Sequence, residues 1–142
     1  MKVNEIMTQN PEFVYSGDSV KRAAEVMRQV NAGAVPIFDG DTAIGILTDR
    51  DIAVRLVAEG KDPLNVKAGE IMSKDPVFCS SDADIEEAVR LMEDKQLRRL
   101  LVKDAQGKVA GIVSIGDLAV SLDKEKSGEV IKEVSQPSEP ER

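Results

Sequence analysis

The 142-residue chain has 42% hydrophobic and 32% charged residues, a composition typical of a folded globular protein. Its formal net charge of −7 disfavours a nucleic-acid or acidic-membrane surface, because contacts with phosphates need clustered Lys and Arg. With no histidine and one cysteine, the chain cannot form a Ser-His-Asp triad, a Cys-His dyad, an ordinary zinc site or an intrachain disulfide. No apolar run approaches the length of a membrane span, and the N-terminal residues lack the apolar stretch of a signal peptide, so we expect a cytoplasmic protein.

The chain contains the same unit twice. Residues 6–11 (IMTQNP) align with residues 71–76 (IMSKDP), and the match continues, with one extra residue in a loop of the second copy, to Asp51 and Asp117. A unit of roughly 65 residues buries little apolar surface alone, so we expect the two copies to pack together and the chain to form a homodimer. We place the first domain at residues 1–62, the second at 63–122, and a polar tail, partly helical or disordered, at 123–142.

In the first copy an extended lead-in precedes a helix that begins after Ser19. Strands are predicted at residues 34–38 and 43–47, and a second helix begins at Thr48 and leads into a connector at residues 58–67. The apolar face of the first helix is formed by Val20, Ala23, Ala24 and Met27.

The second copy repeats this order. Asp84 is the predicted N-cap of its first helix, with Glu87 as capping-box partner, and Cys79 just before it aligns with Val14 and is expected to be a small core residue rather than a reactive thiol. Strands are predicted at residues 100–103 and 109–113, and the second helix begins at Ser114. The apolar face of the first helix is formed by Ile85, Ala88, Val89 and Met92.

The polar tail contains one short amphipathic pattern, formed by Val130, Ile131 and Val134. Two alternatives remain open for it: a solvated tail, or a helix docked on a partner subunit. Residues 136–140 (QPSEP) are expected to be disordered.

Each second strand ends in a hydroxyl that is followed three residues later by a carboxylate: Thr48 with Asp51, and Ser114 with Asp117. One interpretation is structural, because this spacing forms a capping box at a helix start. The other is functional, because a helix N-terminus offers unpaired N–H groups to a phosphate and a carboxylate can accept hydrogen bonds from the vicinal hydroxyls of a ribose. The two interpretations are compatible, since one hydroxyl can cap the helix and still face a cleft.

The ordered motifs, present twice, resemble the CBS domain. They are the IMT and IMS openings, the apolar strand GAVPI at residues 33–37, and Gly-apolar-apolar-Thr/Ser-x-x-Asp at residues 45–51 and 111–117. The resemblance covers residues 3–122, and residues 97–102 and 116–120 look like those of small stand-alone bacterial or archaeal CBS-pair proteins. It implies an α+β (mixed α/β) fold of two pseudo-symmetric CBS units, each a small sheet flanked by two helices. Such a pair, a Bateman module, has two clefts between its units.

The resemblance also implies a ligand site. In the family the Asp binds ribose hydroxyls, the Thr or Ser lies beside ribose and phosphate, and the preceding strand contacts adenine. Arg98 and Arg99 match positions where relatives place basic residues on phosphate, which suits the guanidinium fork. The structural alternative is a solvated pair, or an ion pair with Glu93 or Asp94. The implied residues are Thr48, Asp51, Ser114, Asp117, Arg98, Arg99 and, as a further candidate, Arg50 for ribose and phosphate, and Ala34, Val35, Pro36 and Leu101 for adenine.

The two copies depart from the pattern in different ways. Leu101 stands at the proline position of the second copy, and Gly33-Ala34 replaces the double arginine in the first. The resemblance therefore implies two unequal clefts, of which one or both could be occupied.

These observations predict a regulatory nucleotide-sensing module, not an enzyme, that binds AMP, ADP or ATP, with S-adenosylmethionine or NAD as further candidates. No metal and no tightly bound cofactor are expected, and the sequence does not identify the effector protein. The main alternative is a protein- or nucleic-acid-interaction module that binds no nucleotide, although the acidic net charge disfavours nucleic acid. A cryptic enzyme is the third function class. Other nucleotide motifs are absent, since Gly40 and Gly45 have P-loop spacing but Ile46-Leu47 follow instead of Lys-Ser/Thr.

Overall fold

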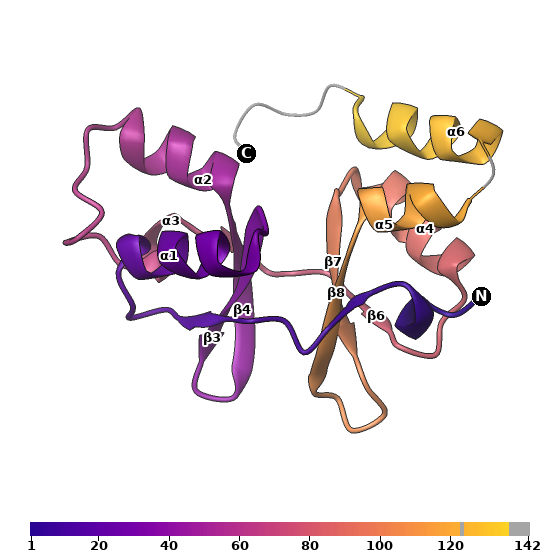
Figure 1. Cartoon of the computed structure of the whole chain (residues 1–142), viewed down its shortest axis with the longest axis horizontal. Helices are drawn as coiled ribbons and strands as arrows, with labels where there is room; N and C mark the ends of the chain where they lie inside the picture. The colour runs from indigo at the N-terminus through magenta and orange to yellow at the C-terminus, as the bar shows by residue number, and fades with distance from the viewer. Residues whose placement is uncertain (123, 137–142) are drawn as a thin grey trace. The chain divides into compact units, whose positions relative to one another are not determined.

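The computed structural model describes residues 1–122 and 124–136, with the backbone only at 124–127. The chain forms two compact units (Figure 1). We name each after its predicted ribose-binding acid. The Asp51 unit is Pro11–Pro76, and the Asp117 unit is Met1–Asn10 together with the chain from Val77 onward.

The Asp51 unit is a four-stranded sheet in the order β2-β3-β4-β5, with one parallel pair, β2 and β3. Its strands are β2 (Val14–Tyr15), β3 (Ala34–Asp39), β4 (Thr42–Thr48) and β5 (Ser73–Lys74). Its helices are α1 (Val20–Val30), α2 (Asp49–Ile52), which continues as the π-helical turn η2 (Ala53–Val57), and α3 (Ala68–Ile71).

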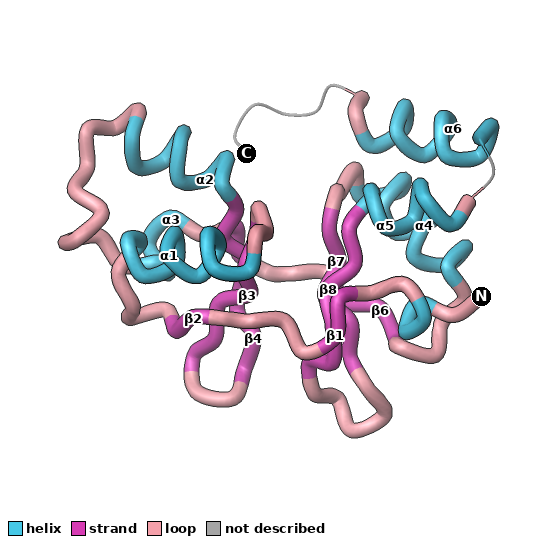
Figure 2. Tube along the Cα trace, in the orientation of Figure 1, coloured by secondary structure: helices cyan, strands magenta, loops and turns pink. Residues whose placement is uncertain are grey.

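The Asp117 unit repeats this arrangement, with the sheet order β6-β7-β8-β1 (Figure 2). Its strands are β6 (Phe78–Ser80), β7 (Arg99–Lys103), β8 (Val109–Ser114) and β1 (Thr8–Gln9). Its helices are the 3-10 turn η1 (Val3–Glu5), α4 (Ile85–Lys95), α5 (Ile115–Ser121) and α6 (Lys124–Val134). The predicted α+β fold, with one small sheet and its helices in each unit, is confirmed.

The lead-in of each sequence copy belongs to the sheet of the other copy. Thr8 of β1 lies opposite Ile112 of β8, and Ser73 of β5 lies opposite Ile46 of β4. A glycine permits each approach. A Cβ built on Gly45 would lie 2.7 Å from the carbonyl oxygen of Ser73, and one on Gly111 would lie 2.8 Å from that of Thr8. A spatial unit therefore combines the body of one copy with the lead-in of the other.

The predicted first helices are confirmed, with one change in the buried face of α1. Ser19 caps α1, because its Oγ accepts the Arg22 N–H at 3.1 Å. All four predicted core residues of α4 are buried. In α1, however, Ala24 is exposed and Val26 is buried in its place, which centres the buried face between Ala23 and Val26.

The capping box predicted at Asp84 and Glu87 is wrong. Asp84 is the N-cap residue, but its side chain makes no capping hydrogen bond. Its carboxylate instead pairs with the Lys2 ammonium at 3.2 Å, because the exchanged lead-in runs beside the start of α4. Sequence reasoning within one copy could not include this competing partner.

Helix α6 packs on its own unit, against α4 and α5. Val130 and Val134 are buried in the core of the Asp117 unit, while Ile131 is 46% exposed. The predicted amphipathic helix is thus confirmed, and its solvated placement is wrong; docking on a partner subunit stays a prediction. The disorder expected at residues 136–140 falls, apart from Gln136, outside the described residues.

Cys79 is a core residue, as predicted, and is 8% exposed. Burial, with a smaller contribution from the negative charge of Glu87, raises the pKa of its thiol from 9.0 to about 11. At neutral pH it is therefore a neutral, inert thiol.

Among the described residues, no helix is long and apolar enough to cross a bilayer.

Candidate functional site

The first candidate site is the corner where β4 ends and α2 begins. Thr48 Oγ1 accepts the Asp51 N–H at 3.1 Å, and Asp51 Oδ2 accepts the Thr48 N–H at 2.9 Å. Both halves of the capping box are present, so the structural interpretation of this motif is confirmed. The box also fixes the Asp51 carboxylate at the helix start.

Two further side chains engage the Asp51 carboxylate. The Ser73 hydroxyl, from the exchanged lead-in, lies 3.3 Å from both Oδ1 and Oδ2. Arg55 Nε lies 3.9 Å from Oδ1, and Arg55 Nη1 donates to the Met72 carbonyl oxygen at 2.9 Å. Asp51 is 7% exposed and is the one charged residue that is buried in the described part of the chain.

The second candidate site is the matching corner between β8 and α5. Ser114 Oγ accepts the Asp117 N–H at 3.1 Å, and Asp117 Oδ2 accepts the Ser114 N–H at 2.9 Å. Asp117 is only partly buried. Among the side chains that the structure describes, at residues 1–122 and 128–136, none donates a hydrogen bond to its carboxylate. Thr8 and Ser121 align with Ser73 and Arg55, but Ser121 Oγ donates to the Asp117 backbone oxygen at 3.3 Å.

The two predicted phosphate-binding arginines lie at this second corner. Arg99 is the β7 residue opposite Ser114, and the Arg98 carbonyl oxygen accepts the Ile115 N–H at 2.8 Å. The Arg98 guanidinium donates to the Ser135 hydroxyl just beyond α6, at 3.1 Å. Within the described residues neither arginine forms an ion pair with Glu93 or Asp94, which excludes that alternative for this structure.

Arg50 lies in the other unit. It is exposed on α2, and its N–H donates to its neighbour Asp49 at 2.8 Å. The structure thus brings Ser114, Asp117, Arg98 and Arg99 together at one corner, and Thr48, Asp51 and Arg50 at the other.

The predicted adenine-binding residues lie on the strands beside these corners. Ala34 is opposite Thr48 and Pro36 is opposite Ile46, on the β3–β4 ladder. Val35 belongs to the core of its unit, so by strand alternation Ala34 and Pro36 occupy the other face. Leu101 is fully buried and, like Ala34, lies outside the core cluster of its unit.

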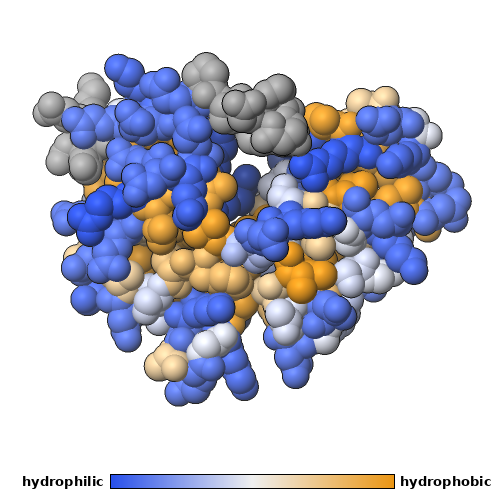
Figure 3. All heavy atoms as spheres, turned by 180° about the vertical axis from the view of Figure 1, so that it is seen from behind, coloured by the Kyte–Doolittle hydropathy of each residue, from blue (hydrophilic) through white to orange (hydrophobic). Residues whose placement is uncertain are grey.

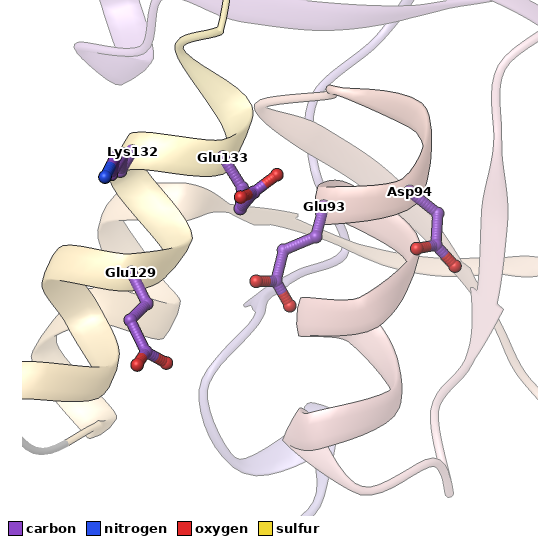
Figure 4. Close-up of a pocket in the computed structure, with 5 residues that line it drawn as sticks. All are labelled: Glu93, Asp94, Glu129, Lys132 and Glu133. Carbon is purple, nitrogen blue, oxygen red and sulfur yellow. The ribbon is translucent and has the colours of Figure 1, made fainter.

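A separate pocket of about 500 Å³ lies between α4 and α6 and shares no residue with either corner (Figure 4). Its acidic lining repels anions and does not suit a phosphate group. Across the described residues, no cluster of three or more carboxylate or thiol side chains is arranged to hold a metal ion. The residues lining the pocket are Glu93, Asp94, Glu129, Lys132 and Glu133.

Sequence reasoning missed three residues at the corners: Ser73, Arg55 and Ser135. Ser73 belongs to the IMS opening, and this motif alone does not indicate that the residue lies beside Asp51 of the first copy. Arg55 lies four residues after Asp51, a spacing that brings side chains together on a helix and could have been noticed. Nothing in the local sequence connects Ser135 with Arg98.

Comparison with known protein families identifies the family of this chain, because two consecutive segments match the same family model. The family model for the CBS domain matches residues 3–58 and 68–124. The chain belongs to the CBS-domain family. Among curated relatives, the CBS domain-containing protein YhcV of Bacillus subtilis is 37% identical over 94% of this chain and 94% of its own length.

Solved CBS structures share the fold. CBSX2 of Arabidopsis thaliana, crystallised in complex with AMP, is 26% identical, with a TM-score of 0.69 over 84% of this chain and 94% of that one. The CBS domain pair of protein MJ0100, crystallised with 5-methylthioadenosine and S-adenosyl-L-methionine, is 25% identical, with a TM-score of 0.75 over 85% of this chain and 94% of that one. Adenosine ligands are therefore bound by proteins with this fold.

Proposed function

We propose that this CBS-pair protein is a regulatory module that binds an adenosine ligand at its Thr/Ser-x-x-Asp corners. The observation that carries the proposal is the Asp117 corner, where a partly exposed carboxylate, a helix start and two arginines belong to one unit. These groups are complementary to a ribose diol and a phosphate. Adenosine ligands in two structural neighbours support the same chemical class.

Each group has a proposed role. The carboxylates of Asp117 and Asp51 accept the ribose hydroxyls, and Ser114 and Thr48 lie beside ribose and phosphate. Arg98 and Arg99 bind phosphate at one corner, and Arg50 is the candidate at the other. Adenine contacts come from Ala34, Pro36, Leu101 and the backbone of Val35, whose side chain lies in the core.

The proposal extends to how the protein works. The ligand acts as a signal rather than a substrate, and the chain passes its occupancy to an effector protein. We also propose that the chain is a homodimer and acts in the cytoplasm. AMP, ADP and ATP are the first candidates for the ligand, followed by S-adenosylmethionine and NAD.

Calorimetric titration of the whole chain with these five ligands tests the proposal. At least one ligand should bind, and Asp117→Asn should weaken it roughly 10- to 150-fold, since a hydrogen bond to a charged group contributes about 1.5–3 kcal/mol. Asn retains an oxygen that can accept the Ser114 N–H in the capping box of α5, so the fold should persist. Asp94→Asn, on the exposed surface of α4, is the matched control. Absence of binding by all five ligands would contradict the proposal.

A further inference from the structure

The two corners of this chain have the same capping box but differ in what else reaches the carboxylate. At Asp51 the Ser73 hydroxyl lies 3.3 Å from each carboxylate oxygen, and Arg55 Nε lies 3.9 Å from one of them. At Asp117 the Ser114 N–H is the one donor among the described residues. Asp51 is buried, whereas Asp117 is partly exposed.

This difference decides how readily each carboxylate can accept a ribose diol. A carboxylate has about four lone-pair sites, and two ribose hydroxyls need two of them. At Asp117 one site is used by Ser114. At Asp51 the Thr48 N–H, the Ser73 hydroxyl and the Arg55 guanidinium already lie around both oxygens. A ribose there competes with Ser73 and Arg55 for a carboxylate that is only 7% exposed, and the loss of the Ser73 hydrogen bond offsets the hydrogen bond that the ribose gains.

Arg55 helps to keep Ser73 in contact with the Asp51 carboxylate. The same guanidinium donates to the carbonyl oxygens of Met72 at 2.9 Å and Ile71 at 3.3 Å. It therefore holds the lead-in that carries Ser73 against the Asp51 corner. The matching position in the Asp117 unit is Ser121, which is too short to bridge a carboxylate and a neighbouring chain segment.

We propose that the adenosine ligand occupies the Asp117 corner first, and that Ser73 and Arg55 form a latch that holds the Asp51 corner closed. This inference rests on the proposed function and ranks the two corners of the chain by their affinity for the ligand. The Asp51 corner binds the same ligand more weakly, and it opens when the Ser73 hydroxyl moves away from Asp51. The latch residues, Arg55 and Ser73, thus set the difference in affinity between the two corners.

Titration of the whole chain with AMP tests this ranking. Asp117→Asn should weaken the tighter binding event roughly 10- to 150-fold, and Asp51→Asn should weaken it far less. Ser73→Ala removes the latch hydroxyl at an exposed position and should strengthen the weaker event several-fold. The matched control is Thr8→Ala, because Thr8 aligns with Ser73 and is exposed but donates no hydrogen bond to Asp117.

Two results would overturn the ranking while leaving the proposed function intact. One is an equal or larger loss of AMP affinity in Asp51→Asn than in Asp117→Asn. The other is an identical titration of Ser73→Ala and Thr8→Ala. No binding of AMP or of the other four ligands to the wild-type chain would instead contradict the proposed function, and the ranking with it. Melting temperatures of all four variants show whether each is folded.

Discussion

At the scale of single residues, Arg98 and Arg99 are the groups that separate phosphate recognition from the binding of a nucleoside. Both lie at the Asp117 corner of an acidic chain, and in this structure the Arg98 guanidinium donates to the Ser135 hydroxyl. A phosphate is a stronger acceptor for a guanidinium than a neutral hydroxyl is, so it can replace Ser135.

Replacing both arginines with Gln should therefore reduce the affinity for AMP much more than the affinity for adenosine. Adenosine retains the ribose contact to Asp117, which needs neither arginine. The measurement is the ratio of adenosine to AMP dissociation constants in wild type and double variant, at low and high salt, because screening weakens the phosphate contact. Arg90→Gln, exposed on α4, is the control. An unchanged ratio would remove both arginines from the site.

Cys79 gives a second residue-scale prediction, which concerns stability. The pKa of its thiol is about 11 in the folded chain against an ordinary value of 9.0, so between these values the unfolded chain loses the proton first. The free energy of unfolding should fall as the pH rises from 9.0 towards 11, and Cys79 should resist thiol reagents until the chain unfolds. Urea titrations of wild type and Cys79→Ala measure this, since the variant should lose less stability over that range. Rapid labelling of the folded chain at pH 8 would contradict it.

At the scale of the elements, Gly45 and Gly111 permit the exchange of lead-ins. A Cβ at either position would lie within 2.8 Å of a carbonyl oxygen of the crossing strand, closer than real contacts allow. Gly45→Ala and Gly111→Ala should each lower the free energy of unfolding by about 1–3 kcal/mol, the usual cost of overpacking. Gly17→Ala is the matched control, because a Cβ there meets nothing within 4 Å. Equal stability of all three variants would show that the lead-ins do not cross at these glycines.

The elements also show what the sequence can predict. Helices α1 and α4 and the long strands follow from periodicity, and the start of α1 also follows from its Ser19 cap. The capping boxes at Thr48 and Ser114 follow from spacing. The lead-in strands β1 and β5 have two residues each, too few for a pattern, and their partners lie in the other copy.

The same limit applies to the site. The residues at each corner were identified from local motifs, and the structure brings them to two corners as described. The latch of Ser73 and Arg55 depends on a contact between residues 22 apart in the chain, and the contact of Arg98 with Ser135 spans 37. The amphipathic pattern of α6 predicted a helix but not the surface that receives it. Long-range packing is therefore the part that local sequence could not determine.

At the scale of the whole molecule, exposed apolar side chains favour self-association. The face drawn in Figure 3 is largely polar but also carries apolar side chains. Val54 and Val57 on η2 are 43% and 67% exposed, and Val120 on α5, which aligns with Val54, is 89% exposed. Covering such residues is favourable, by about 25 cal/mol for each Å² of apolar surface removed from water.

Light scattering at micromolar concentration should therefore report a homodimer, and the double variant Val54→Glu, Val120→Glu should shift it towards monomer. Both side chains are exposed, so each unit should stay folded, as circular dichroism can verify. A clean monomer of the wild-type chain would contradict the predicted assembly without bearing on the ligand site.

The central claim is that a carboxylate at a strand-to-helix corner binds the ribose diol of an adenosine ligand. Its most direct test compares AMP with its 2′,3′-dideoxy analogue in calorimetric titrations of the wild-type chain and of Asp117→Asn. The account predicts that the wild-type chain binds AMP at least tenfold more tightly than the analogue, since one hydrogen bond to a charged group has about that effect. It also predicts that this preference largely disappears in Asp117→Asn. Equal binding of the two ligands by the wild-type chain, or a preference that survives the substitution, would contradict the claim.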